Sequence, residues 1–238
     1  MGAAHTATIG AIRTLATDVL EYQLELDVQE RDLKWRPGQF ISLTCGHDAE
    51  GKPRLRSYSI ASPPGTGRLD LVLKLVSGGE GSEWFRGLRG GEVVNFTGPM
   101  GFFVLDLQHP GDQLFAATGT GIAPFLPMIR ESLARDETGT VHLLWGLRDE
   151  GDLFWRDELR ALVAASPRFR YAIHLTRPSP SWTGATGRIT QPALDVAPTL
   201  HRPTFYLCGS GAMIRDLRDA LVARGVDRKR QIRSEAFF

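Results

Sequence analysis

The stretch Arg56-Ser57-Tyr58-Ser59 carries a cation, an aromatic ring and two hydroxyl groups within four residues. It lies between strand-prone runs, and successive side chains of an extended strand point to opposite faces. Arg56 and Tyr58 are therefore predicted on one side, with Ser57 and Ser59 on the other. Such a strand offers a charge to a phosphate, a flat face to a ring and a hydroxyl to a ring heteroatom.

Three glycine-rich turns could approach phosphates, at residues 78–82 (Gly-Gly-Glu-Gly-Ser), 119–124 (Gly-Thr-Gly-Ile-Ala-Pro) and 208–211 (Cys-Gly-Ser-Gly). Glycines let the backbone come close to a phosphate, and the N-terminus of a following helix offers free amides. The turn at 119–124 is GxGxxP and not the GxGxxG fingerprint, so alone it fits a packing turn equally well. The turn at 78–82 also fits a flexible hairpin with an ordinary serine cap.

Arg177 and Arg188 lie in a segment without any Asp or Glu from residue 175 to residue 194. Two guanidinium groups on an acid-free loop suit bidentate recognition of a 2′-phosphate, and a solvated loop with incidental arginines is an equal alternative. Cys208 fits a small buried apolar residue at least as well as a catalytic thiol. The chain ends in Phe237-Phe238, which could pack on the core or cover a cofactor ring.

The elements that must position these residues differ between the two halves. Up to residue 108, turn residues separate short strand-prone runs, which favours an antiparallel barrel or sandwich. Ser82 is predicted to cap one helix there, at 82–88. Beyond residue 112, strands alternate with helices, which favours a doubly wound parallel sheet. The predicted strands are 7–16, 20–27, 39–45, 57–60, 69–76, 92–97, 113–117, 141–145, 169–176, 204–208 and 231–237, and the later helices are 124–135, 153–165 and 212–224.

The composition and charge of the chain argue against several classes of function. A net charge of +1 over 238 residues argues against nucleic acid as a general partner. The apolar stretches are too short for a membrane span, and residues 1–8 lack the features of a secretory signal, so a cytoplasmic location is expected. Two cysteines, Cys45 and Cys208, are too few for a four-cysteine iron–sulfur cluster. The six histidines show no metal-ligand spacing, so no metal site is expected.

In chain order, the stretch 56–59, the turns at 79–82, 98–101 (Gly-Pro-Met-Gly), 119–124 and 208–211, and the end 235–237 (Glu-Ala-Phe) resemble the ferredoxin–NADP reductase family. The resemblance runs from about residue 9 to residue 238. It implies an FAD-binding antiparallel Greek-key β-barrel at 1–108. An NAD(P)-binding α/β domain with an aromatic tail is implied at 109–238. The resemblance is to bacterial members without a fused ferredoxin domain.

The same resemblance implies roles for individual residues. Arg56 and the amides around Gly81 would hold the FAD diphosphate, Tyr58 would stack on the isoalloxazine, and Ser59 would lie near flavin N5. The implied catalytic residues are Ser59, Cys208, Glu235 and Phe237. The implied cofactor-binding residues are Arg56, Ser57, Tyr58, Ser59, Lys74, Val76, Gly81, Ser82, Glu83, Thr120, Gly121, Pro124, Arg177, Arg188, Gly209, Phe237 and Phe238. Plant-type members end in Tyr, so here either terminal phenyl ring could stack.

The implied activity is hydride transfer from NADPH or NADH to the flavin, followed by transfer of single electrons to a separate ferredoxin, flavodoxin or oxygenase component. Arg177 and Arg188 favour NADPH. Two alternatives stay open: a reductase that binds and releases free flavin, and a flavin-binding electron-transfer subunit that oxidises no nucleotide. A monomer is expected.

Overall fold

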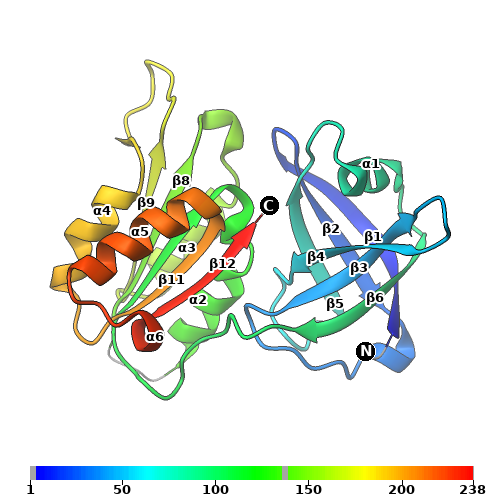
Figure 1. The fold of residues 1–238 in the computed structure, drawn as a ribbon, viewed down its shortest axis with the longest axis horizontal. Coiled ribbons are helices and arrows are strands. Elements are labelled where there is room, and N and C mark those ends of the chain that lie inside the picture. The colour runs from blue at the N-terminus through cyan, green and yellow to red at the C-terminus, as the bar shows by residue number, and fades with distance from the viewer. Residues whose placement is uncertain (1–3, 136–138, 238) are drawn as a thin grey trace. The chain divides into compact units, whose positions relative to one another are not determined.

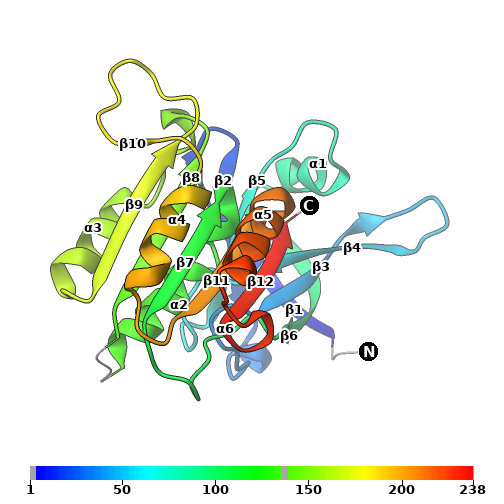
Figure 2. The ribbon, with the colours of Figure 1, turned by 60° about the vertical axis from the view of Figure 1, so that its left-hand side comes forward.

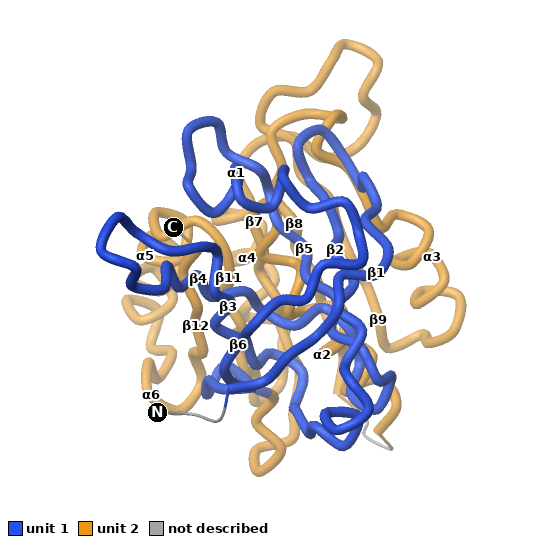
Figure 3. The backbone as a smooth tube through the Cα atoms, turned by 90° about the vertical axis from the view of Figure 1, so that its right-hand side faces the viewer, with its two compact units in different colours: residues 1–104 blue, residues 105–238 orange. Residues whose placement is uncertain are grey.

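The computed structural model describes residues 4–135 and 139–237. The chain divides into two compact units, Met1–Val104 and Leu105–Phe238 (Figure 3). The predicted domain boundary lies after residue 108, whereas the first unit ends at Val104. Within the described residues, no helix is long and apolar enough to cross a membrane.

The described part of the first unit forms a six-stranded antiparallel sheet in the order β4-β3-β6-β1-β2-β5 (Figure 1). An antiparallel bridge between Ile60 and Leu71 joins the end of β4 to β5 and closes the sheet into a barrel. The non-sequential neighbours β3-β6-β1 confirm the predicted Greek-key arrangement. The strands are β1 (Ala4–Ala16), β2 (Val19–Leu26), β3 (Phe40–His47), β4 (Pro53–Ser59), β5 (Arg68–Lys74) and β6 (Val93–Met100).

Apolar side chains that alternate along these strands meet inside the barrel. Ile41 and Leu43 of β3, and Phe96 of β6, are almost fully buried there. Helix α1 (Glu80–Gly87) covers one end of the barrel (Figure 1) and buries Phe85 in the same core. The hydroxyl of Tyr22 donates to the Phe85 carbonyl at 3.0 Å, which fixes the helix against β2.

The prediction that Ser82 caps this helix is wrong. The helix begins two residues earlier, at Glu80, with Gly79 as the N-cap. Ser82 lies in the first helical turn, and its hydroxyl accepts a hydrogen bond from the Val76 amide at 2.9 Å. The serine therefore connects the preceding loop to the helix. A serine at the start of a helix can cap it or bind a nearby loop amide, and the sequence pattern does not distinguish the two.

The described part of the second unit forms a six-stranded parallel sheet in the order β10-β9-β8-β7-β11-β12 (Figure 2), which confirms the predicted doubly wound class. Figure 2 shows α4 and α5 on one face of this sheet and α2 and α3 on the other. The strands are β7 (Gln113–Thr118), β8 (Val141–Leu147), β9 (Phe169–Leu175), β10 (Ala185–Thr186), β11 (Thr204–Ser210) and β12 (Ile232–Phe237). The helices are α2 (Phe125–Ala134), α3 (Arg156–Ala165), α4 (Thr190–Val196), α5 (Gly211–Ala223) and α6 (Arg228–Gln231). Short 3-10 turns are η1 (Val28–Glu30), η2 (Gly119–Ile122), η3 (Glu150–Asp152) and η4 (Ala197–Thr199).

The central strand β7 is buried on both faces, as parallel strands require. Leu114 and Ala116 pack with α4 and α5. On the opposite face, the Phe115 ring stacks on Tyr206 with centroids 4.7 Å apart and meets Phe125 of α2 edge-on at 5.0 Å. The helices on both faces therefore hold β7 and its carboxyl end in place.

Four elements of the second unit differ from the sequence prediction. The elements β10, α4 and α6 were not predicted, because each is short and the first two lie in a segment rich in turn residues. The helix predicted at 153–165 begins at Arg156, since Trp155 has a φ of 51°, which breaks helical geometry. Residues 150–152 form the turn η3 in its place.

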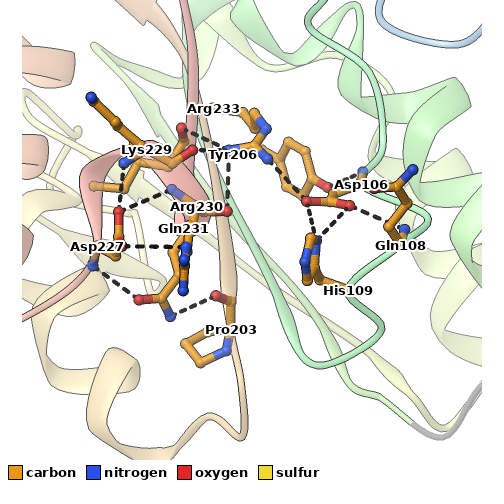
Figure 4. A network of polar contacts seen from close by, with 11 residues as sticks. Asp106, Gln108, His109, Pro203, Tyr206, Asp227, Lys229, Arg230, Gln231 and Arg233 are labelled. Carbon is orange, nitrogen blue, oxygen red and sulfur yellow. Dashed lines mark hydrogen bonds and ion pairs between the residues drawn. The ribbon is translucent and has the colours of Figure 1, made fainter.

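The segment after Val104 is bound to the second unit through Asp106 (Figure 4). The Asp106 amide donates to the Tyr206 hydroxyl at 2.8 Å, and its carboxylate accepts from Arg233 of β12 at 2.9 Å. Although burial opposes ionisation, hydrogen bonds from Gln108 and His109 and the charge of Arg233 lower the pKa of the Asp106 carboxyl. These contacts explain why residues from 105 onward belong to the second unit.

Candidate cofactor sites

In the first unit, β4 presents Arg56 and Tyr58 toward the start of α1. An added Cβ atom at Gly81 would lie 3.1 Å from the Tyr58 hydroxyl and 3.3 Å from Arg56 Cγ. Both side chains therefore reach the same glycine from one side of the strand, as the alternation predicts. Gly81 is buried, and its missing side chain keeps the backbone of the first helical turn close to both groups.

This arrangement fits a ligand that carries both a diphosphate and a flat ring. The N-terminus of α1 offers amide groups that no helical carbonyl can satisfy, and Arg56 is exposed beside it. The Tyr58 ring is half-buried and meets Phe85 edge-on with centroids 5.1 Å apart. A cation, the amides of the first helical turn and a packed aromatic ring thus surround one glycine, which is the donor set that FAD would need, although the Glu83 amide donates to the Gly79 carbonyl at 2.9 Å.

The hydroxyl of Tyr58 lies beside the buried thiol of Cys45. Burial raises the pKa of Tyr58, and the neighbouring Cys45 thiol raises it further. Burial likewise raises the pKa of Cys45 to about 11, against a hydrogen bond from Tyr58 that lowers it. Both groups are therefore neutral at neutral pH, and Tyr58 presents an uncharged ring.

The other predicted residues of the first unit are placed less closely around Gly81. Ser59 is buried at the end of β4, opposite Phe40, whereas Ser57 is exposed and pairs with Ser42. Lys74 ends β5 and is half-buried. Two further residues are exposed and flank the helix start: Val76, whose amide binds Ser82, and Glu83, whose carboxylate pairs with Arg86.

In the second unit, the carboxyl ends of β7 and β11 meet where the strand order reverses, the position at which such sheets bind ligands. The Ser210 amide donates to the Thr118 hydroxyl at 2.8 Å, which links the two glycine turns. Gly209 has a φ of 118°, and an added Cβ atom there would lie 2.5 Å from the Thr118 carbonyl oxygen. A side chain at 209 is therefore excluded by both conformation and space.

The turn after β7 packs equally closely on β11. An added Cβ atom at Gly121 would lie 2.5 Å from the Cys208 carbonyl oxygen. The indole of Trp145 donates to the Gly119 carbonyl at 2.9 Å and holds the turn from the β8 side. Thr120 is half-buried within this turn, and Pro124 is buried directly before α2. The structure therefore brings Thr120, Gly121 and Gly209 to one edge of the sheet.

The strand β12 adds its carboxyl end to this edge. Its parallel register pairs Glu235 with Cys208 and Phe237 with Ser210. Burial, together with the charge of Glu235, raises the pKa of the Cys208 thiol well above its usual range. The thiol is therefore neutral and not a nucleophile. Phe237 is half-buried, and the predicted site residue Phe238 lies outside the described residues.

Arg177 and Arg188 follow the paired strands β9 and β10. The parallel register matches Leu175 with Thr186, and each arginine comes two residues after its strand partner. Both side chains are exposed, and within residues 4–135 and 139–237 neither has an acidic partner. Two exposed guanidinium groups without an acidic partner in the described part of the chain thus follow the neighbouring strands β9 and β10.

Sequence reasoning missed several residues of these sites. Arg54 and Glu80 form ion pairs at the start of α1, and the R-x-R-x-Y alternation of residues 54–58 could have indicated Arg54. Thr118 and Trp145 hold the turn after β7 through contacts between strands, for which the sequence has no local signal. Within the described residues, no group of three or more His, Cys, Asp or Glu side chains could hold a metal ion.

Comparison with known proteins defines the class. Residues 6–105 match the oxidoreductase FAD-binding domain, and residues 115–219 match the oxidoreductase NAD-binding domain. The chain is therefore a two-domain oxidoreductase that binds FAD and a nicotinamide nucleotide. It is 36% identical to ferredoxin–NADP reductase B of Sorangium cellulosum over 230 residues, which are 92% of this chain and 91% of that relative. The chain belongs to the ferredoxin–NADP reductase family.

More distant relatives and solved structures match nearly all of this chain. The chain is 29% identical over 97% of its length to a ferredoxin–NAD(P)(+) reductase component of naphthalene dioxygenase and salicylate hydroxylase systems from Ralstonia, and covers 68% of it. A cytochrome P450 reductase from Amycolatopsis has a TM-score of 0.87 at 26% identity, with 100% of this chain and 71% of that chain covered. A ferredoxin–NADP+ reductase from Neisseria gonorrhoeae with bound FAD and NADP has the same fold, with a TM-score of 0.85 at 23% identity over 99% of each chain.

Proposed function

We propose that this protein transfers hydride from NADPH to FAD and then delivers single electrons to a separate redox protein of the ferredoxin, flavodoxin or oxygenase type. One observation carries the proposal: a single chain holds an FAD-binding and an NAD-binding domain, each with its own glycine-lined cradle. Relatives named as ferredoxin reductases and as a dioxygenase electron transfer component support it.

In the first unit, we assign Arg56 and the amides around Gly81, Ser82 and Glu83 to the flavin diphosphate, and Tyr58 to one face of the ring. The buried Ser59 hydroxyl would lie at the reacting edge of the ring. Lys74, Val76 and Ser57 would line the remainder of the site. A bound flavin would supply the chemistry that couples two-electron oxidation of the nucleotide to one-electron transfer.

In the second unit, we assign the turns around Thr120, Gly121, Pro124 and Gly209 to the nucleotide diphosphate. Such turns suit it because they lie at the carboxyl ends of β7 and β11 and lead into the N-termini of α2 and α5. Cys208 and Glu235 would orient the nicotinamide. Their neutral thiol and adjacent carboxylate provide a polar contact without a competing nucleophile. Phe237, half-buried at the end of β12, is assigned to contact with a cofactor ring.

The acceptor is proposed to be a separate protein because this chain has two cysteines, both buried and far apart in sequence. An iron–sulfur cluster needs four ligands, which are usually thiolates, and burial raises the pKa of both thiols. The unpaired guanidinium groups of Arg177 and Arg188 support NADPH over NADH. We further propose a monomeric cytoplasmic protein, for which gel filtration is the direct check of the oligomeric state.

One experiment tests the proposed reaction: the visible spectrum of the purified protein, followed by anaerobic titration with NADPH and with NADH. The expected result is a yellow protein whose flavin bleaches stoichiometrically with NADPH. A colourless protein that binds riboflavin as well as FAD would instead indicate a free-flavin reductase. A bound flavin that neither nucleotide bleaches would contradict the reductase function.

A further inference from the structure

The carboxylate of Glu80 lies between two guanidinium groups at the start of α1. Its Oε2 pairs with Arg56 Nη2 at 3.1 Å, and its Oε1 pairs with Arg54 Nη1 at 3.5 Å. Arg54 precedes Arg56 by two residues on β4, so the two side chains project from the same side of the strand. One acidic side chain therefore bridges both cations beside the glycine cradle.

Glu80 is also the first residue of α1, where the helix dipole favours negative charge. A carboxylate with two oxygens, each facing one guanidinium, offers the contacts that a phosphate group would otherwise make. The same arginines and the same helix end are the groups that the proposed function assigns to the flavin diphosphate. Glu80 and the diphosphate thus require the same positive groups.

We propose that Arg54 is a second cation of the diphosphate clamp and that Glu80 is an internal anion that competes with the diphosphate for it. This inference rests on the proposed FAD site. Binding of FAD exchanges the carboxylate for phosphate at one or both guanidinium groups. Glu80 therefore lowers the affinity for FAD and makes the flavin easier to exchange.

The exposure of these side chains determines the size of the effect. The side chains of Arg54, Arg56 and Glu80 are 38%, 45% and 53% exposed. Ion pairs exposed to this extent are weak, so the carboxylate can be displaced and does not block the site. Because Glu80 also repels the diphosphate directly, its removal should tighten FAD binding roughly three- to tenfold at low salt.

The test is titration of the full-length, flavin-stripped protein with FAD and with riboflavin, followed by flavin fluorescence. Glu80→Gln should lower the FAD dissociation constant by the stated factor and leave that of riboflavin unchanged, since riboflavin has no diphosphate. Glu50→Gln is the matched control, because Glu50 is exposed in the turn between β3 and β4. The advantage of Glu80→Gln over the wild type should narrow as salt rises.

A second pair of variants tests Arg54. Arg54→Met should weaken FAD binding at least threefold without affecting riboflavin. In the double variant Arg54→Met/Glu80→Gln, the gain from Glu80→Gln should shrink, because the two side chains act on one another. Thermal melting of each variant shows that it folds, and Glu80→Ala serves as a second removal of the charge.

The outcomes separate this inference from the proposed function. Unchanged or weaker FAD binding by both folded Glu80 variants overturns the competing anion, and so does an equal gain for riboflavin. Unchanged FAD binding by Arg54→Met overturns the two-arginine clamp. In those cases the wild type still binds FAD. Failure of the wild type and all variants to bind FAD would instead contradict the proposed function itself.

Discussion

Three kinds of neighbour hold the side chain of Tyr58. Its ring meets Phe85 edge-on, its hydroxyl lies beside the Cys45 thiol, and that hydroxyl would lie 3.1 Å from a Cβ atom added at Gly81. A ring held in this way loses little side-chain entropy when it stacks on a ligand. At the scale of single residues, the proposed flavin site therefore depends on a buried thiol as well as on the residues that would touch the cofactor.

The buried Cys45 thiol should make stability depend on alkaline pH. Its pKa is about 11 in the folded protein, whereas an unfolded thiol ionises near 8.5. Because the folded value is raised, its contribution to stability is complete below about pH 8.5 and is lost as pH rises toward 11. Between pH 8 and 10.5, the free energy of unfolding of the wild type should fall about 1–2 kcal/mol more than that of Cys45→Ala. The free energies come from denaturant unfolding at each pH, and an equal fall for the wild type and Cys45→Ala would contradict this prediction.

Arg177 should set the preference between the two nucleotides. Its exposed guanidinium has no acidic partner within the described residues, and Arg188 follows the neighbouring strand β10. A hydrogen bond between charged groups contributes about 1.5–3 kcal/mol, so Arg177→Ala should lower the ratio of kcat/KM for NADPH to that for NADH roughly tenfold or more. Arg170→Ala, at an exposed position on β9, the strand that Arg177 follows, is the control. An unchanged ratio in Arg177→Ala would remove the basis for NADPH.

At the scale of elements, the two glycine turns of the second unit act as one structure. The Thr118 hydroxyl accepts a hydrogen bond from the Ser210 amide, Gly121 packs on the Cys208 carbonyl, and Gly209 packs on Thr118. The ends of β7 and β11 are therefore held together by the Thr118 hydroxyl and by close packing of the two glycine backbones.

The substitution Gly209→Ala should disrupt both turns. The φ of 118° is strained for any L residue, and the new Cβ atom would lie 2.5 Å from the Thr118 carbonyl oxygen. We expect a loss of roughly 2–4 kcal/mol in the free energy of unfolding and a large rise in KM for the nucleotide. Gly211→Ala is the matched control, because its Cβ atom would meet only Arg215 at 3.5 Å. Equal stability of the two variants would show that the turn can relax.

At the scale of the whole molecule, each unit has its own hydrophobic core. The barrel core includes Ile41, Leu71 and Phe96, and the core of the second unit includes Leu207 and Leu217. Units with separate cores are expected to fold separately. The segment from Leu105 belongs with the second unit because Asp106 binds Tyr206 and Arg233 there (Figure 4).

Two fragments test this division. A fragment of residues 105–238 should fold, whereas one of residues 109–238 leaves Arg233 and the Tyr206 hydroxyl without Asp106. We expect the shorter fragment to be less stable by roughly 1–3 kcal/mol, seen as a lower Tm in thermal unfolding. Asp106→Asn in the longer fragment should have a smaller effect, because the backbone amide of residue 106 can still donate its hydrogen bond to the Tyr206 hydroxyl. Equal Tm values for both fragments would place the boundary after residue 108.

Much of this protein could be predicted from local rules in the sequence. Alternation along a strand places Arg56 and Tyr58 on one side, and glycine turns after strands indicate where phosphates can approach. Short strand-prone runs up to residue 108, followed by strands that alternate with helices, predict a barrel followed by a parallel sheet. These features depend on neighbouring residues, so a single sequence contains them. The start of α1 and the two-residue strand β10 are exceptions, because short elements depend on tertiary contacts.

Only the tertiary structure decided which distant residues meet. The pairing of Cys208 with Glu235 depends on the register of β11 and β12. The hydrogen bond from the Ser210 amide to the Thr118 hydroxyl depends on the strand order. The contact of Glu80 with Arg54 and Arg56 requires α1 to pack beside β4. Long-range packing of buried surfaces sets strand order and helix position, and no local pattern encodes it. By itself, the sequence Arg56–Ser59 determined that one strand carries a cation, an aromatic ring and hydroxyl groups. The packing of α1 beside β4 decided that the carboxylate of Glu80 pairs with the Arg56 cation.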